Sequence, residues 1–192
     1  MSFAHDSYQV LPQFVDPKQV AFCQQVIKFD AAAGRLQADT TVPGAPAGRD
    51  NGMLQRLQEM LRPRLEEITG KRLFRTYVYY RIYQRGNTLH KHRDRPACEY
   101  SITLNLGGAS DVDWPIFVKS RGHEVPVHLS PGDAMLYKGC EVLHWREAYT
   151  GDEQVQAFLH YVDQDGPYAD HKDDAIDGAI DTAKYGATNG AA

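Results

Sequence analysis

The chain has 192 residues and a formal net charge of −4, with 42% hydrophobic and 24% charged residues. This length and balance predict one globular domain with its own core. The lack of a basic excess argues against nucleic-acid binding, and no run of about 20 apolar residues is present to cross a membrane. The first residues lack the pattern of a signal peptide, and three cysteines are too few for a disulfide framework. We therefore expect a cytoplasmic protein that binds neither nucleic acid nor membrane.

The N-terminal third has the pattern of helices. Asp16 followed by Pro17 is typical of a helix start, and the apolar residues after it recur at helical spacing. Residues 39–52 are rich in Gly, Pro and Asp, which predicts a loop. A second helix is expected over residues 54–68, where leucines recur at helical spacing until Gly70 ends the pattern.

From residue 73 onward the pattern changes to short strands separated by Gly, Pro and Asp. The expected strands cover residues 75–83, 99–107, 114–118, 124–129, 133–139, 141–149 and 154–162. Helices followed by many evenly spaced strands predict a mostly β protein, a small jelly-roll barrel with helices on one side. We expect a single domain over residues 1–165, with helical support in 1–72 and the barrel in 73–165. Residues 166–192 are expected to form a flexible C-terminal extension.

One histidine–aspartate pair and one distant histidine carry the chemistry. On an extended segment His92 and Asp94 point to the same side, so both can hold one ion. His144, on a later strand, can complete three ligands on one face of a metal. Two imidazoles and one carboxylate leave coordination positions open, which an iron(II) oxygenase needs for O₂ and a chelating co-substrate. The same pair taken alone is a weak signal, because it is more often a surface histidine beside a solvated aspartate.

The surroundings of these residues resemble a known family. The run YxxGxxLxxHxD from Tyr83 to Asp94, the strand SITLNL, the turn and strand PGDAMLY, and His144 follow in order. Over residues 73–163 the chain is similar to the prolyl-4-hydroxylase-like branch of the 2-oxoglutarate/Fe(II) oxygenases. The resemblance implies a double-stranded β-helix with His92, Asp94 and His144 as catalytic iron ligands. It also implies O₂-dependent decarboxylation of 2-oxoglutarate to succinate, coupled to hydroxylation of a small-molecule or peptidyl substrate.

The chain departs from the family at the co-substrate site. The family usually has an arginine or lysine about ten residues after the second histidine, and here that position is Gln154. A neutral amide is a poor partner for a buried carboxylate. Arg146 faces the same side of its strand as His144, so we expect it to bind 2-oxoglutarate, with Lys138 and Arg81 as alternatives. The resemblance also implies that the Tyr83 hydroxyl helps to hold the co-substrate.

Other interpretations remain open at this stage. His90, His92, Glu99 and His144 resemble the three-histidine, one-glutamate set of the cupins, which would act without 2-oxoglutarate. A non-catalytic metal-binding barrel also fits, because Gln154 replaces the usual cation. Arg95 follows the ligand aspartate, where it can reach an anionic group on a substrate or can remain a surface arginine. The substrate, the type of oxidation and the oligomeric state are not indicated by the sequence.

Overall fold

The computed structural model describes residues 3–110 and 112–174. Its helices are α1 (Phe3–Asp6), α2 (Pro17–Ala32) and α3 (Gly52–Thr69), with the 3-10 helices η1 (Pro96–Cys98) and η2 (Ala169–Asp173). The first five strands are β1 (Tyr8–Leu11), β2 (Gln37–Ala38), β3 (Pro46–Arg49), β4 (Leu73–Gln84) and β5 (Leu89–His92). The later strands are β6 (Tyr100–Gly108), β7 (Ile116–Ser120), β8 (His123–Val127), β9 (Ala134–Lys138), β10 (His144–Arg146) and β11 (Glu153–Asp163).

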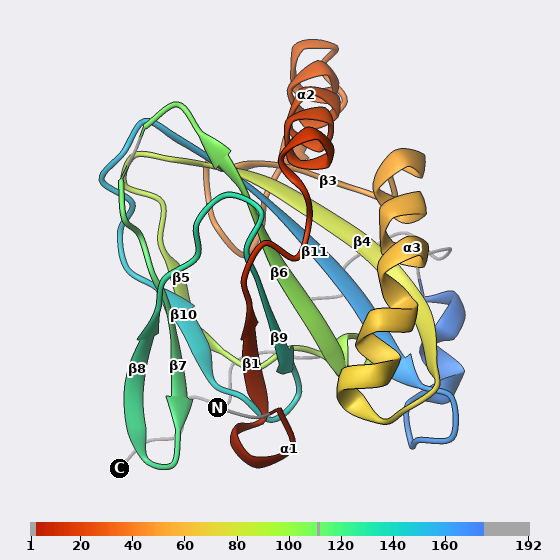
Figure 1. Cartoon of the computed structure of the whole chain (residues 1–192). Helices are drawn as coiled ribbons and strands as arrows, with labels where there is room; N and C mark the ends of the chain where they lie inside the picture. The colour runs from red at the N-terminus through yellow and green to blue at the C-terminus, as the bar shows by residue number, and fades with distance from the viewer. Residues whose placement is uncertain (1–2, 111, 175–192) are drawn as a thin grey trace.

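The strands form two antiparallel sheets that face each other. The larger sheet has the order β1-β9-β6-β11-β4-β3-β2, and the smaller one has the order β5-β10-β7-β8. Figure 1 shows the smaller sheet on one side of the larger sheet and the helices α2 and α3 on the other. The predicted mostly β jelly roll with N-terminal helices is confirmed.

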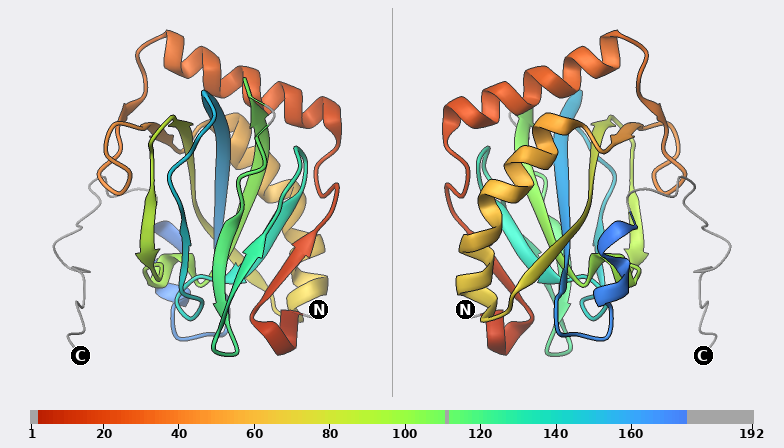
Figure 2. Two further views of the ribbon diagram at one scale, coloured as in Figure 1. Left: turned by 90° about the vertical axis from the view of Figure 1, so that its left-hand side faces the viewer. Right: turned by 90° about the vertical axis from the view of Figure 1, so that its right-hand side faces the viewer.

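Local signals set the ends of both long helices. The Asp16 carboxylate accepts hydrogen bonds from the N–H groups of Lys18 and Gln19, which caps α2. Gly70 ends α3 in the left-handed conformation, with φ 66°. The helices pack their apolar sides on the larger sheet, and Figure 2 shows α2 crossing the top of that sheet. None of the described helices is long and apolar enough to cross a bilayer.

The larger sheet buries both of its faces. On β6, Ile102 and Leu104 belong to the core shared with α2 and α3. Because side chains alternate along a strand, Ser101, Thr103 and Asn105 point the opposite way, toward the smaller sheet. The space between the sheets, which we call the lumen, is therefore lined by many polar side chains.

The N-terminal region differs from its expected role as helical support and loop. β1 joins the edge of the larger sheet beside β9, and β2 and β3 extend the other edge beside β4. Residues 46–49 lie in the expected loop but form β3 because they pair with β4. Of the expected C-terminal extension, residues 169–173 form η2, and residues 175–192 lie outside the described residues.

Candidate metal and co-substrate site

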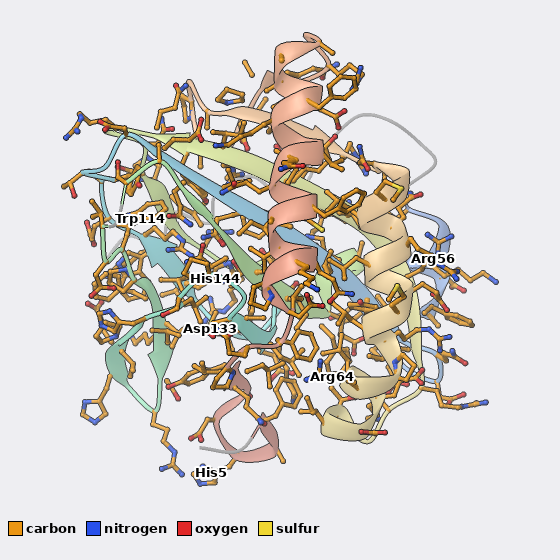
Figure 3. All side chains as sticks on the ribbon, turned by 45° about the horizontal axis from the view of Figure 1, so that its top comes forward. His5, Arg56, Arg64, Trp114, Asp133 and His144 are labelled. Carbon is orange, nitrogen blue, oxygen red and sulfur yellow. The ribbon has the colours of Figure 1, made fainter. Side chains whose placement is uncertain are left out.

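Three side chains with metal-binding chemistry meet beside the end of β5. His92 ends β5 and His144 begins β10, and the antiparallel register places them directly opposite each other. The Oδ1 atom of Asp94 is 3.4 Å from His92 Nε2 and 3.5 Å from His144 Nε2. One possible ligand atom from each residue lies within 4.8 Å of the other two. The residues chosen from the sequence are thus brought together, and Figure 3 shows His144 inside the barrel.

Both imidazoles are held by backbone carbonyls. His92 Nδ1 is 2.9 Å from the carbonyl oxygen of His90, and His144 Nδ1 is 2.9 Å from that of Val142. A carbonyl oxygen only accepts, so each Nδ1 must carry the hydrogen. Each neutral ring therefore has its lone pair on Nε2, the atom that faces Asp94. This tautomer is the one that a metal ligand requires.

The Asp94 carboxylate sits in a tightly fitted position. Its backbone N–H donates to the carbonyl oxygen of Gly139, and a Cβ at Gly139 would lie 2.6 Å from Asp94 Oδ2. Glycine at residue 139 therefore makes room for the carboxylate. Ser101 Oγ lies 3.2 Å from Asp94 Oδ2 and 2.9 Å from the Nδ1 atom of buried His160. The carboxylate is held by a hydrogen-bonded chain as well as by its backbone.

A second group of possible ligands shares this aspartate. Donor atoms of Asp94, Cys98 and His160 also lie within 4.8 Å of one another. Burial raises the pKa of the Cys98 thiol well above its usual value, and its sulfur lies 3.0 Å from the Tyr77 hydroxyl. A neutral thiol is a weak metal ligand. We therefore interpret Cys98 and His160 as packing and hydrogen-bonding support for Asp94.

The three possible ligands differ in protonation. Burial would raise the pKa of Asp94, but His144 and His92 hold it well below its usual range, so the carboxylate is ionised. Burial lowers the pKa of His144 to about 4, which keeps this imidazole neutral at neutral pH. Burial also acts to lower the pKa of His92, but the hydrogen bond with Asp94 raises it. Of the two imidazoles, His92 therefore takes up a proton at a higher pH than His144 does.

These donors fit a divalent metal ion such as iron(II). Two nitrogens and one carboxylate oxygen on one face of an ion leave the opposite positions open. Ligands about 2.1 Å from an ion and at right angles to each other lie about 3 Å apart. The separations of 3.4 and 3.5 Å at Asp94 are close to that spacing.

Arg146 places an unbalanced positive charge in the same lumen. Its side chain is 2% exposed, and its Nη1 donates to the Trp114 carbonyl oxygen at 2.7 Å. The Nε and Nη2 atoms are buried and have no hydrogen-bond partner among the described residues. Burial lowers the pKa of Arg146 to about 10, so the guanidinium stays charged at neutral pH. A buried cation with two free donors indicates space for an anion.

Tyr83 adds a donor to this part of the lumen. Arg81 Nη1 lies 2.6 Å from the Tyr83 hydroxyl and can only donate to it. The phenolic hydrogen of Tyr83 therefore remains available to another acceptor. The ring of Tyr83 contacts Trp114 at a centroid distance of 4.8 Å, and the Arg146 guanidinium lies over the same Trp114 ring. Tyr83 and Arg146 are thus joined through Trp114.

The alternative cations are already balanced. Arg81 forms a buried ion pair with Asp39, which also accepts from the Tyr79 hydroxyl at 2.7 Å. Lys138 lies 3.4 Å from Glu141. Burial acts to raise the pKa of Asp39, but Arg81 and hydrogen bonds hold it below its usual value. Arg146 is therefore the free cation among the three arginines and lysines considered from the sequence.

Gln154 stands where the family has its basic residue. It is buried, and its amide nitrogen donates to Asn105 Oδ1. Both residues also line a cavity of about 780 Å³ between α2 and the segment after β6, and none of the three possible metal ligands lines it. The amide of Gln154 therefore closes a polar contact between strands and brings no charge to the lumen.

The cupin-type set is not assembled. The His90 side chain is exposed, and its backbone carbonyl serves His92. The Glu99 carboxylate accepts from the backbone N–H of Asp163. Neither side chain belongs to a ligand group within the described residues. The geometry favours Asp94 as the carboxylate partner of His92 and His144.

Sequence reasoning missed several residues that shape the site. Asp39 lies in the segment expected to be a loop, and nothing in its local sequence indicates that it balances Arg81. Ser101 has no ligand spacing, although the alternation in the β6 strand marks it as a polar, inward-facing position, whereas His160 in its apolar strand is typical of the buried, hydrogen-bonded barrel histidine that the structure shows. Gly139 had a visible signal, because it directly follows an apolar strand.

The chain shares this fold with solved proteins, two of which have a metal ion and 2-oxoglutarate (α-ketoglutarate) bound. A Pseudomonas putida prolyl-4-hydroxylase matches with a TM-score of 0.69 and 16% identity, over 83% of this chain and 94% of the other. The epimerase SnoN of nogalamycin biosynthesis, in complex with Fe³⁺, α-ketoglutarate and nogalamycin RO, matches with a TM-score of 0.72 and 14% identity, over 92% and 89%. HygX from Streptomyces hygroscopicus, with nickel and 2-oxoglutarate bound, matches with a TM-score of 0.65 and 13% identity, over 85% of each chain.

These comparisons define a fold class. The chain has the double-stranded β-helix fold of the 2-oxoglutarate/Fe(II) oxygenases, as its resemblance to the prolyl-4-hydroxylase-like branch predicted. No protein-family model and no curated protein sequence matches the chain.

Proposed function

We propose that this protein is a 2-oxoglutarate-dependent iron(II) oxygenase that hydroxylates a small-molecule or peptidyl substrate. His92, Asp94 and His144 bind Fe(II), and Arg146 with Tyr83 binds the distal carboxylate of 2-oxoglutarate. The observation that carries the proposal is the pairing of two features in one lumen. A set of three ligand atoms within 4.8 Å lies in the same barrel as a buried arginine with unused donors.

The residues have separate tasks in this proposal. Iron(II) with bound 2-oxoglutarate and O₂ supplies the oxidising power, and the co-substrate leaves as succinate and CO₂. The carbonyl oxygens of His90 and Val142 orient the two imidazoles, and Ser101 orients Asp94. Arg146 binds the distal carboxylate through a planar fork, away from water, where a charge-assisted bond is strong.

The test is an anaerobic titration of the Fe(II)-loaded protein with 2-oxoglutarate. We expect a visible metal-to-ligand charge-transfer band, and succinate formation when O₂ is admitted. Arg146→Met removes the carboxylate partner, so the affinity for 2-oxoglutarate should fall about 30-fold or more. Arg146→Lys should retain part of the affinity. The control is Arg56→Met, since Arg56 is exposed on α3 and points away from the barrel in Figure 3.

Two results would contradict the proposal. A wild-type protein that binds Fe(II) but gives neither the band nor succinate would be a metal-binding barrel without turnover. An unchanged 2-oxoglutarate affinity in Arg146→Met would assign the carboxylate to another cation. In that case Arg81 is the first residue to test, because it lies beside Tyr83.

A further inference from the structure

Two arginines, each paired with a carboxylate, lie next to the proposed metal centre. Arg95 follows Asp94, and its guanidinium carbon lies 4.6 Å from the centroid of the Tyr77 ring. The guanidinium carbon of Arg49 lies 4.9 Å from the same centroid. Tyr77 in turn contacts the His160 ring at 4.5 Å, and His160 belongs to the hydrogen-bonded chain that holds Asp94. Two arginines therefore flank the Tyr77 ring, and Tyr77 contacts the residues that hold Asp94.

A carboxylate from the far end of the described chain is paired with Arg95. Asp174 Oδ2 contacts Arg95 Nη1 in a close ion pair. Asp174 directly follows η2, which packs against β4, β11 and η1. The two side chains are 24% and 28% exposed, so water reaches the pair. An ion pair that is open to solvent contributes little to stability and exchanges readily for another anion.

Ring contacts connect Arg95 with the residues around Asp94. The Arg95 guanidinium lies over the Tyr77 ring, and the Tyr77 ring contacts the His160 ring. An anion bound on Arg95 is therefore within electrostatic reach of the residues around Asp94. Because Tyr77 contacts His160, which is linked through Ser101 to Asp94, such an anion lies on the same side of the larger sheet as the metal ligands. That position suits one end of a molecule whose other end lies at the metal.

The geometry points to a carboxylate subsite on Arg95 that binds the carboxylate of the primary substrate and that Asp174 fills when no substrate is present. The inference rests on the proposed function for the role of the bound molecule as a substrate. The planar guanidinium fork matches a carboxylate, and the group already seated on it is a carboxylate. The substrate class is therefore a small molecule with a free carboxylate, such as an amino acid or another carboxylic acid.

The first experiment measures anion binding without the oxygenase reaction. Metal-free protein is titrated with trifluoroacetate and followed by fluorine NMR, so binding does not depend on turnover. Asp174→Asn removes the competing charge and should tighten trifluoroacetate binding about five-fold, the range of an exposed ion pair. Asp170→Asn is the matched control, because Asp170 is an exposed aspartate on η2. It should leave the affinity unchanged.

A double variant assigns the gain to Arg95. Arg95→Met combined with Asp174→Asn should abolish the five-fold tightening. Trifluoroacetate bound at Arg146 contributes equally to all of these proteins, so it does not affect the comparison. The inference is overturned if Asp174→Asn binds no tighter than the wild type, or if the gain persists without Arg95. Either result would leave the Arg95–Asp174 pair as a tether for η2.

The second experiment links the subsite to turnover. Succinate release is measured with L-amino acids and other carboxylic acids, each paired with its primary amide. Acids should stimulate turnover and amides should not, and the half-saturating concentration of an active acid should fall about five-fold in Asp174→Asn. Equal stimulation by acids and amides would overturn the inference while leaving the oxygenase proposal intact. Trifluoroacetate binding that depends on Arg95, together with no succinate from any compound, would contradict the proposed function instead.

Discussion

The two faces of the larger sheet differ in what they bury. The face toward α2 and α3 packs aliphatic and tyrosine side chains into one core. The lumen face carries Tyr83, Arg81, Ser101 and Gln156, which are also buried. Burying polar groups costs free energy unless they are paired. The helix-side face therefore serves stability, whereas the lumen face accepts a cost in stability to hold a reactive site.

The bonding within the lumen shows how that cost is limited. Arg81 is balanced by Asp39, and Thr103 bonds to Gln156 across adjacent strands at 3.3 Å. Arg146 is the exception, since two of its donors have no partner within the described residues. Almost all of these buried polar groups have hydrogen-bond partners. The unpaired donors of Arg146 therefore indicate where a ligand binds.

The largest expected effect separates function from stability on the lumen face. Asp94→Ala removes the carboxylate that both imidazoles face, so Fe(II) affinity should fall by more than about 100-fold and succinate formation should cease. Isothermal titration with Fe(II) under anaerobic conditions measures the loss. The folded protein should remain, because without Asp94 both imidazoles stay neutral and no buried charge is left unpaired by the change. Retained Fe(II) affinity would show that Asp94 is not a ligand.

A change on the opposite face should have the reverse effect. Leu159 is fully buried in the core shared with the helices, and its neighbour His160 faces the lumen. Leu159→Ala should lower the free energy of unfolding by about 2–5 kcal/mol through the lost contacts and the cavity that remains. Urea unfolding measures this loss, and Fe(II) affinity below the transition should be unchanged. A large loss of Fe(II) affinity would mean that the two faces are coupled.

The sequence predicted the elements whose signals are local. The Asp16 cap, the Gly70 stop and the alternation in β6 placed α2, α3 and the central strands correctly. The glycines and prolines of region 39–52 predict a loop. In fact Gly48 lies in β3, where a Cβ would come within 2.6 Å of the Tyr80 ring. That glycine serves close packing between distant segments, which local sequence does not reveal.

The same limit applies to the site. A short motif and strand parity identified the metal-binding candidates and Arg146. The pairing of Arg81 with Asp39 joins residues 42 positions apart, and the role of Ser101 depends on His160, 59 positions away. Such support residues become visible only when the fold brings them together. The choice of Arg146 over Arg81 and Lys138 therefore depends on which cations already have a carboxylate partner.

A smaller effect is expected from the support of the carboxylate. Ser101 Oγ lies 3.2 Å from Asp94 Oδ2. Ser101→Ala removes this contact but keeps the backbone and the ligand, so Fe(II) affinity should fall about ten-fold. Thr103→Val is the matched control. Thr103 faces the same lumen two residues further along β6, and its hydroxyl bonds to Gln156. Equal Fe(II) affinities for the two variants would argue against a specific role for Ser101.

The smallest effect concerns a polar cluster at the edge of the helix-side layer. Buried Asp30 accepts from Arg35, from Asn51 at 2.8 Å and from the Tyr80 hydroxyl at 2.9 Å, which joins α2, the start of α3 and β4. Burial acts to raise the pKa of Asp30, but these bonds lower it below its ordinary value. A lowered folded-state pKa gives stability that is present above about pH 4 and lost as the pH falls further.

Asp30→Asn should therefore cost about 1 kcal/mol at neutral pH, a modest value because half-exposed Arg35 is screened by solvent. Urea unfolding from neutral pH down to about pH 3 should show the difference from the wild type shrinking below about pH 4, where the wild-type carboxyl takes up a proton. A difference that stays constant with pH would assign the loss to packing rather than to charge. The polar cluster would then behave like the apolar layer around it, and the contrast between the two faces would rest on the lumen alone.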